Sequence, residues 1–382
     1  METAVKKNAG IAGVASEVEA AVMVREGAPT AEGLRAVWHR VTQWETWDWR
    51  IKYILIGPAW LSYCIRARSF WFFTASNPTL TFGGFDGESK REMYVQLPPG
   101  SYPKSIFISP SIPPEELYKL FEDHGFRYPI AVKPDVGKMG FMFRKINSQL
   151  DLEKYHKEII CDYIIQEWID CPLEVSVFYY RLPGSQKGNI SGFVRKDFLE
   201  VTGDGKSTLW ELIRKYPRVQ FRLSEMKAKH AGRLDHVLAK GERYCLSPAL
   251  NLSRGGKLVS LEHEKDERLL KIFDDISHYT GAFYYGRYDV KCNSIEELKQ
   301  GKFIILEYNG SGAEPHHVYG NGYSLWKACL ILIAHWDILH RISRANRGAG
   351  FEYWNFLRGW KFLKNAGKHQ QNLRELDAKN AL

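Results

Sequence analysis

Two segments decide the fold: Tyr285-Gly286-Arg287-Tyr288-Asp289-Val290 and Phe303-Ile304-Ile305-Leu306-Glu307-Tyr308-Asn309. Each is typical of a strand, and residues two apart in a strand share a face, so Arg287 lies beside Asp289 and Glu307 beside Asn309. Carboxylate and amide oxygens suit a Mg²⁺ that bridges phosphates, and Arg287 would neutralise a transferring phosphoryl group. For either strand alone an ordinary charged sheet face is the better interpretation, but the occurrence of two favours a metal site.

Strands and helices surround these two segments without a repeating strand–helix–strand order. The other predicted strands are Ser105–Ile108, Tyr128–Pro134, Tyr163–Trp168, Glu174–Tyr180 and Leu258–Leu261. The predicted helices are one opening at Pro113-Pro114, then Leu152–Ile160, Leu209–Lys215, Glu267–Thr280 and Leu325–Ile342. This order predicts an α+β fold with antiparallel sheets.

Composition limits the classes of function. The chain has 382 residues, enough for two or three packed units, and its 53 Lys and Arg against 44 Asp and Glu give a net charge of +9. Such a charge favours anionic partners: nucleotides, phosphates, nucleic acid or an acidic membrane face. The basic residues do not form one stripe, which argues against nucleic acid. Six cysteines without a C-x-x-C pair or metal spacing indicate a reduced, cytoplasmic protein.

A second motif is a lysine followed by a glycine-containing loop. In Lys133-Pro134-Asp135-Val136-Gly137-Lys138-Met139-Gly140, the lysine ends a strand, and the loop with Gly137 and Gly140 offers backbone N–H groups to a polyphosphate. Many β-turns contain lysine and glycine, so the motif alone is moderately specific. Gly203-Asp204-Gly205-Lys206-Ser207-Thr208 is not a P-loop, because Glu200 stands where that motif requires its first glycine.

A third motif is a strand that runs into a turn. Gln166, Glu167, Trp168 and Ile169 would offer backbone groups to an adenine ring, and Glu174 on the next strand would bind a ribose. The spacing by itself does not establish this role.

Together these motifs resemble the ATP-grasp superfamily, in the carboxylate–amine ligase branch of D-alanine–D-alanine ligases. The segment Val201–Ile213 resembles the V-x-G-D-G-K-x-T-x-x-E-L-I segment of cyanophycin-synthetase-like members, as do Gly241–Arg243 and Asn251–Gly256. The resemblance covers roughly residues 85 to 330. It implies two α+β subdomains that sandwich ATP.

The resemblance also implies roles for single residues. Lys90 and Lys133 would bind phosphates with the loop of Gly137 and Gly140, and Lys133 and Arg287 would be catalytic, with Arg287 on the γ-phosphate. The nucleotide would contact Gln166, Glu167, Trp168, Ile169 and Glu174. Asp289, Glu307 and Asn309 would hold two Mg²⁺ ions. Candidate substrate contacts are Asn251, Arg254, Ser311 and His316.

The chain departs from D-alanine–D-alanine ligases at both ends of this region. An aromatic segment, Trp38–Phe73, replaces the strand–helix–strand domain for the first substrate, and the loop after Asn309 reads Gly310-Ser311-Gly312-Ala313-Glu314-Pro315-His316-His317. We interpret the aromatic segment as core-facing helices, with an interfacial segment touching membrane or an amphiphilic substrate as the alternative. The expected division is a poorly ordered tail (1–30), a divergent N-terminal region (31–112), a small subdomain or lid (113–215), a large subdomain (216–345) and a basic C-terminal extension (346–382).

The expected function is ATP- and Mg²⁺-dependent ligation of a small carboxylate to an amine, through an acyl phosphate, forming a C–N bond and releasing ADP and phosphate. One alternative is a kinase that phosphorylates a small-molecule hydroxyl. Another is a non-catalytic, nucleotide-binding, membrane-associated protein. We expect a cytoplasmic location, with peripheral contact at the inner membrane face as a variant, and no nucleic-acid partner.

Overall fold

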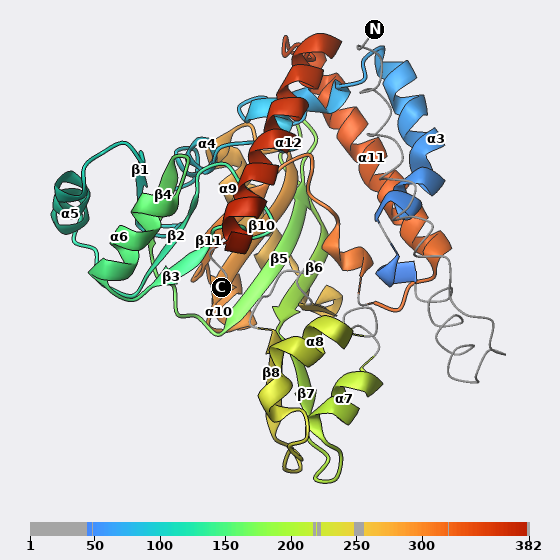
Figure 1. Cartoon of the computed structure of the whole chain (residues 1–382). Coiled ribbons are helices and arrows are strands. Elements are labelled where there is room, and N and C mark those ends of the chain that lie inside the picture. Colours follow the sequence, from blue (N-terminus) through green and yellow to red (C-terminus); the bar gives the residue numbers. More distant parts are fainter. Residues whose placement is uncertain are drawn as a thin grey trace, which may run out of the picture. The chain divides into compact units, whose positions relative to one another are not determined.

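The structure of the chain is a computed structural model that describes residues 44–47, 49–216, 219, 223–247, 256–319 and 321–379. It divides into two units, Met1–Trp49 and Arg50–Leu382. The described part of the first unit contains the short helix η1 (Trp44–Thr46). The second unit mixes helices with sheets in which every described strand pair is antiparallel, which confirms the predicted fold class (Figure 1).

The first sheet has the strand order β1-β4-β2-β3. Its strands are β1 (Ser105–Ile108), β2 (Ile130–Pro134), β3 (Arg144–Ile146) and β4 (Tyr163–Glu167). Two helices, α5 (Pro114–Asp123) and α6 (Gln149–Glu158), pack on it. α5 begins with proline and two glutamates, which suit the positive end of a helix, and buries Leu117 and Phe121, four residues apart on one face.

The second sheet has the order β11-β10-β5-β6-β9. Its strands are β5 (Leu173–Tyr180), β6 (Asn189–Asp197), β9 (Lys257–Ser260), β10 (Tyr285–Cys292) and β11 (Ile304–Asn309). Helix α9 (Glu267–Thr280) covers one face, where Phe273 packs in the same core as Tyr288 and Val290 of β10. Because side chains alternate along β10, Arg287 and Asp289 lie on the opposite face, which leaves that face for a polar site.

The expected division into subdomains stays a prediction. In the sheets, β1, which precedes residue 113, pairs with β4, and β5, within 113–215, pairs with β10, within 216–345. A third, two-stranded sheet of β7 (Leu199–Thr202) and β8 (Arg243–Ser247) packs with α7 (Leu209–Lys215) and α8 (Leu223–Lys229) in a core of its own.

Helices take the place of a strand–helix–strand unit in the described N-terminal part of the second unit. α3 (Trp49–Ala67) packs against α11 (Leu325–Gly348), and the rings of Trp60 and Trp336 meet edge to face at 4.9 Å. Trp71, in the following segment, is buried. Trp60, half-buried on α3, and Trp71, buried in the turn after it, both pack in one core, as the core-facing interpretation expects, whereas Trp38 lies outside the described residues. Of the helices in the described ranges, none is long and apolar enough to cross a membrane.

The expected basic C-terminal extension is largely one helix, α12 (Phe356–Lys379). Its first turn lies against Trp71, whose indole Nε1 donates to the Phe356 carbonyl at 3.0 Å. Gly359 is required there, because a Cβ would lie 2.4 Å from that nitrogen. Its last turns reach the first sheet, where Leu373 is buried in the core and Asp377 binds Arg144 at 2.8 Å. One helix thus connects the N-terminal helices with the first sheet.

Candidate active site

The two strands that decide the fold are neighbours in the second sheet. In the register of β10 and β11, Asp289 stands opposite Glu307 and Arg287 opposite Asn309. The Asn309 amide Nδ2 donates to Asp289 Oδ2 at 3.3 Å. The structure therefore brings together the four residues predicted for metal and phosphate, while their roles stay predictions.

Asp289 is the buried centre of this group. Arg287 donates to both of its oxygens, from Nε to Oδ1 at 3.1 Å and from Nη2 to Oδ2 at 3.2 Å. The Ser176 hydroxyl of β5 also donates to Oδ1. Burial alone would raise the pKa of Asp289, but Arg287 and Lys196 outweigh it and hold this pKa well below its usual range. Asp289 is thus a carboxylate at neutral pH, as a metal ligand must be.

Lys196 of β6 belongs to the site although the sequence did not single it out. Its Nζ lies 2.9 Å from Glu174 Oε1 and 3.2 Å from Asp289 Oδ1, and its side chain is 6% exposed. Burial lowers the pKa of this lysine, but Asp289 and Glu174 outweigh burial and raise it, so the group is a cation. A second cation, after Arg287, is therefore fixed beside Asp289, on the side away from β11.

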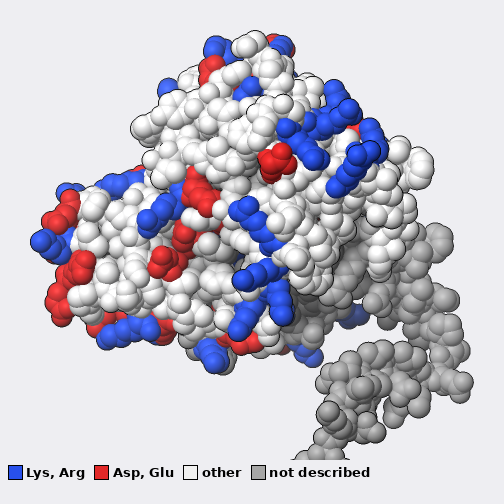
Figure 2. All heavy atoms as spheres, turned by 90° about the horizontal axis from the view of Figure 1, so that it is seen from above, with Lys and Arg blue, Asp and Glu red and all other residues white. Residues whose placement is uncertain are grey.

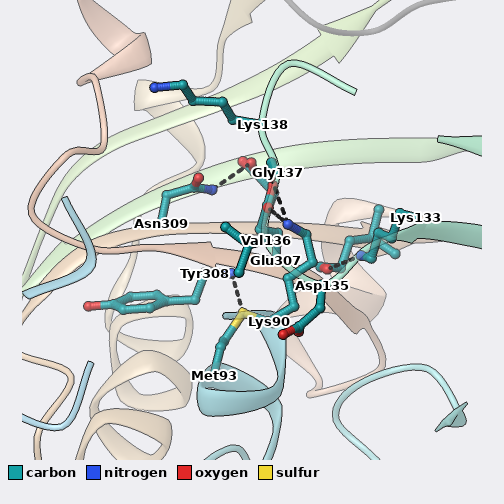
Figure 3. Close-up of polar contacts among 12 residues, drawn as sticks. Lys90, Met93, Lys133, Asp135, Val136, Gly137, Lys138, Glu307, Tyr308 and Asn309 are labelled. Carbon is teal, nitrogen blue, oxygen red and sulfur yellow. Dashed lines mark hydrogen bonds and ion pairs between the residues drawn. The ribbon is translucent and has the colours of Figure 1, made fainter. Parts of the chain in front are cut away.

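Two lysines approach Glu307 from elements outside the second sheet (Figure 3). Lys90, at the start of α4 (Lys90–Tyr94), lies 3.5 Å from Glu307 Oε1 and donates to the Gly137 carbonyl at 2.8 Å. Lys133, on β2, donates to the Leu306 carbonyl at 3.2 Å and to the Tyr94 hydroxyl at 3.1 Å. Burial lowers the pKa of Lys133, although Glu307 and Glu174 oppose the shift. Both predicted phosphate lysines are therefore beside the predicted metal ligand.

The glycine loop is fixed from two directions. On one side, Asp135 receives the Ser89 hydroxyl at 2.7 Å and the Arg91 backbone N–H at 3.0 Å, so the loop is joined to the start of α4. On the other side, His369 Nε2 of α12 lies 2.9 Å from the Val136 carbonyl. Gly140 has a φ of 69°, in the left-handed region that favours glycine.

The predicted adenine hinge is the connection between the two larger sheets. Gln166 and Glu167 end β4 of the first sheet, and Glu174 lies at the start of β5 in the second. Between them, the Ile169 carbonyl accepts from Lys291 Nζ at 3.0 Å, and the Trp168 ring lies 4.4 Å from Lys145 Nζ. Lysines of two other strands thus contact this segment, and its role as an adenine hinge stays a prediction.

The loop after Asn309 contacts Arg287. The guanidinium Nη1 lies 3.1 Å from the Glu314 carbonyl and 3.1 Å from His316 Nε2. Burial, and then Arg287, lowers the pKa of His316 well below its usual value, so this neutral ring accepts at Nε2 and carries its proton on Nδ1. Neither that Nδ1 nor the Ser311 hydroxyl has a hydrogen-bond partner among the described residues. Of the other predicted substrate contacts, Asn251 and Arg254 lie outside the described residues.

No protein-family profile matches the chain, and no curated protein sequence matches it. Several solved structures do match the chain. A bifunctional glutathione synthetase from Pasteurella multocida is 16% identical, with a TM-score of 0.40, over 65% of this chain and 35% of its own. D-alanine–D-alanine ligase from Bacillus anthracis is 15% identical, with a TM-score of 0.38, over 69% of both chains. The ATP-grasp ligase PsnB is 14% identical, with a TM-score of 0.33, over 62% of this chain and 56% of its own.

All three TM-scores lie below 0.5, so this likeness carries no argument about the family, the ligands or the activity of the chain. The resemblance to the ATP-grasp superfamily rests on the sequence motifs. The chain also spans only about a third of the bifunctional glutathione synthetase. Any activity must therefore be inferred from the residues of the site itself.

Proposed function

We propose that the chain is an ATP- and Mg²⁺-dependent carboxylate–amine ligase. The observation that supports it is one arrangement: Asp289, Glu307 and Asn309 on adjacent strands, with Arg287 and Lys196 beside them and Lys90 and Lys133 approaching from other elements. Such a site offers charge to phosphates and ligands to a metal, but no activated nucleophile. It suits a reaction that depends on positioning and charge neutralisation.

The residues present fit a magnesium site. Mg²⁺ takes oxygen ligands and is commonly held by one or two carboxylates together with substrate phosphates, so it needs no all-protein cage. The described residues contain no group of three His, Cys, Asp or Glu that could hold an ion alone. Both carboxylates are already within 3.5 Å of cationic nitrogens, Lys90 for Glu307 and Arg287 for Asp289. When bound, Mg²⁺ would neutralise charge on the β- and γ-phosphates.

In the proposed reaction, an oxygen of the carboxylate substrate attacks the γ-phosphorus, and the bond to the β–γ bridging oxygen breaks, releasing ADP. Lys90 and Lys133 hold the polyphosphate, while Arg287 and Lys196 stabilise the charge on the transferring group. The amine nitrogen then attacks the acyl carbon, phosphate leaves and the nitrogen loses a proton. His316, neutral and bound to Arg287, keeps that guanidinium aimed at the phosphoryl group.

An ADP-release screen tests the proposal. Purified protein, ATP and Mg²⁺ are combined with pairs of amino acids, small peptides and other carboxylates and amines, and products are identified by mass. ADP release that requires both a carboxylate and an amine, with a product lighter than the pair by one water, supports a ligase. ADP release with a phosphorylated hydroxyl compound and no amine requirement contradicts it in favour of a kinase.

A matched pair of variants shows whether any turnover belongs to this site. Asp289→Asn keeps the shape of the side chain and removes the charge, so ADP release should fall by at least about a hundredfold. Asp197→Asn changes the same residue type on β6, where the aspartate pairs with Arg195 at 2.6 Å, and should leave turnover unchanged.

A further inference from the structure

Helix α3 carries an apolar stripe on its outer side. Ile51, Ile54, Leu55, Leu61 and Ile65 are all exposed, Ile54 by 73% and Ile65 by 69%. At 3.6 residues per turn, these five positions fall within an arc of about 120° on one side of the helix. The stripe is about 21 Å long at 1.5 Å per residue, which makes it a continuous surface and not a scatter of single apolar residues.

The inner side of α3 is also apolar. Ile56, Tyr63 and Cys64 are buried, and the Tyr53 ring stacks on Trp336 of α11 at 6.0 Å. From Tyr53 to Ile65 the sequence contains no charged residue. A helix at the surface of a protein in water normally has a polar outer face, and one that is apolar on all sides is buried or in contact with lipid. The outer side of α3 therefore requires a covering partner.

Aromatic residues extend this stripe beyond the end of α3. Phe70 is exposed, and its ring lies 6.1 Å from that of Phe356, at the start of α12. Phe356 in turn stacks at 6.2 Å with Trp360, and Leu357 between them is 77% exposed. We call the α3 stripe together with Phe70, Phe356, Leu357 and Trp360 the apolar face.

Arginines border the apolar face where α3 and α11 end. Arg347 of α11 donates to the Ala67 carbonyl at 3.3 Å, which joins the two helix ends. Burial, and then Arg66 and Arg344, lower the pKa of His340 against the opposing effect of Asp337, so two arginines and one carboxylate lie near the same ring. Arg66, Arg68, Arg344, Arg347 and Arg358 are all exposed. Figure 2, which looks onto this end of the second unit, shows Lys and Arg side chains gathered beside uncharged surface.

We propose that the apolar face docks the protein on an anionic lipid bilayer as a peripheral, non-spanning contact. Amphipathic helices that lie in the interface bury aliphatic and aromatic side chains among the acyl chains and place basic groups at the headgroups. The charge argues for lipid over a second copy of the chain. A two-fold contact through this face would bring two sets of arginines together and repel, whereas an anionic headgroup layer neutralises them.

Co-sedimentation of the full-length protein with vesicles tests this inference. At low salt, the protein should pellet with phosphatidylcholine vesicles that contain phosphatidylglycerol and much less with phosphatidylcholine alone. Raising salt to about 0.5 M should weaken binding, because exposed charges are then screened. If the protein stays in the supernatant with anionic vesicles at low salt, the proposal is overturned. Another part of the chain or a second copy would then cover the apolar face.

Two matched pairs of variants locate the contact. Leu357→Ser should weaken vesicle binding about tenfold. Leu150→Ser, on helix α6 beside the first sheet, should leave binding unchanged. Leu150 is 75% exposed, so the two leucines are equally accessible. Removing two charges with Arg66→Gln and Arg344→Gln should weaken binding to anionic vesicles about thirtyfold, about fivefold per charge. Lys119→Gln and Lys154→Gln, an equal loss of charge at exposed sites on α5 and α6, should have little effect.

The outcome of these pairs decides between a local contact and general attraction to negative charge. Equal effects of Leu357→Ser and Leu150→Ser, or of the two charge pairs, would overturn the proposal, since a chain of net charge +9 adheres weakly to any anionic surface. Light scattering on the same variants tests whether a second copy of the chain covers the apolar face. If the protein is a dimer that Leu357→Ser dissociates, and it does not bind vesicles, the proposal is also overturned.

Discussion

Lys196 on β6 and Asp289 on β10 lie 3.2 Å apart, from Nζ to Oδ1, although β5 separates their strands in the sheet. The contact forms because Lys196 reaches across Glu174 of β5, which it also binds. Removing one partner of a buried ion pair leaves the other charge buried and unpaired. This costs far more free energy of folding than an exposed ion pair contributes. The lysine thus pairs with two acidic groups of the candidate site at once.

The Lys196→Met variant should lose turnover. Methionine has a similar length but no charge, so Glu174 and Asp289 lose their common partner and the transferring phosphoryl group loses a cation; kcat for ADP release should fall by about a hundredfold or more. Arg195→Met is the control. Arg195 precedes Lys196 on the same strand and pairs with Asp197 on the other face of the sheet. Normal kcat in Lys196→Met, with nucleotide still bound, would remove Lys196 from the reaction.

The Glu307→Gln variant should separate metal binding from folding. The Glu307 side chain is 36% exposed and its ion pair with Lys90 is 3.5 Å long, so the melting temperature should change little. Turnover should fall by orders of magnitude, and more Mg²⁺ should be needed for half-maximal ADP release, because the site loses a charged ligand. Glu296→Gln, at an exposed glutamate paired with Arg268, is the matched control. An unchanged Mg²⁺ dependence would contradict the metal assignment.

The two strands that carry the carboxylates could be predicted from local patterns. The apolar run before Glu307 and the aromatic residues before Asp289 indicate strands, and alternation places Arg287 on the face of Asp289 and Asn309 on the face of Glu307. Lys133 could be predicted because a buried strand ends there, just before a glycine loop. These features depend on residues close together in the sequence, which is why the pattern was sufficient.

Lys196 and α12 could not be predicted, for two physical reasons. β6 contains Ser191 and Gly192 and lacks a clean alternation, and the burial of Lys196 depends on carboxylates from two other strands. α12 buries only Gly359 and Leu373 and therefore has a polar composition that favours an extension. Gly192 is small because His317 lies against it: a Cβ would stand 2.0 Å from Nδ1 of that histidine. Such contacts between distant segments leave no local pattern.

Acid should destabilise the protein through His317. Burial lowers the pKa of this histidine to about 4, from an ordinary value near 6.5. The unfolded chain therefore takes up a proton below about pH 6.5 while the folded one does so only near pH 4, and stability is lost as pH falls between these values. At pH 5 the loss is about 2 kcal/mol. Urea unfolding at pH 7 and pH 5 measures it; His317→Gln should reduce the difference, and His263→Gln, at an exposed histidine, should not.

The end of α12 should control how well the glycine loop binds phosphate. Asp377 Oδ1 accepts from the Met142 backbone N–H at 2.9 Å and from Arg144 Nη1 at 2.8 Å, so it holds the far end of the loop that Lys90 contacts at Gly137. In Asp377→Asn the charge-assisted bond to Arg144 is lost while the shape is kept, and we expect the KM for ATP to rise several-fold with little change in kcat.

Hydrogen exchange of the backbone amides between residues 136 and 144 supplies the second readout, because a loosened loop exchanges faster whether or not a substrate is known. Glu375→Gln changes an exposed acidic residue of the same helix, one that faces Gln371 at 3.0 Å, and should alter neither quantity. Faster exchange with an unchanged KM would mean that α12 stabilises the loop without affecting ATP. An Asp377→Asn variant with neither change would show that the contact is dispensable, and that the contacts at Asp135, Val136 and Gly137 are enough to hold the glycine loop.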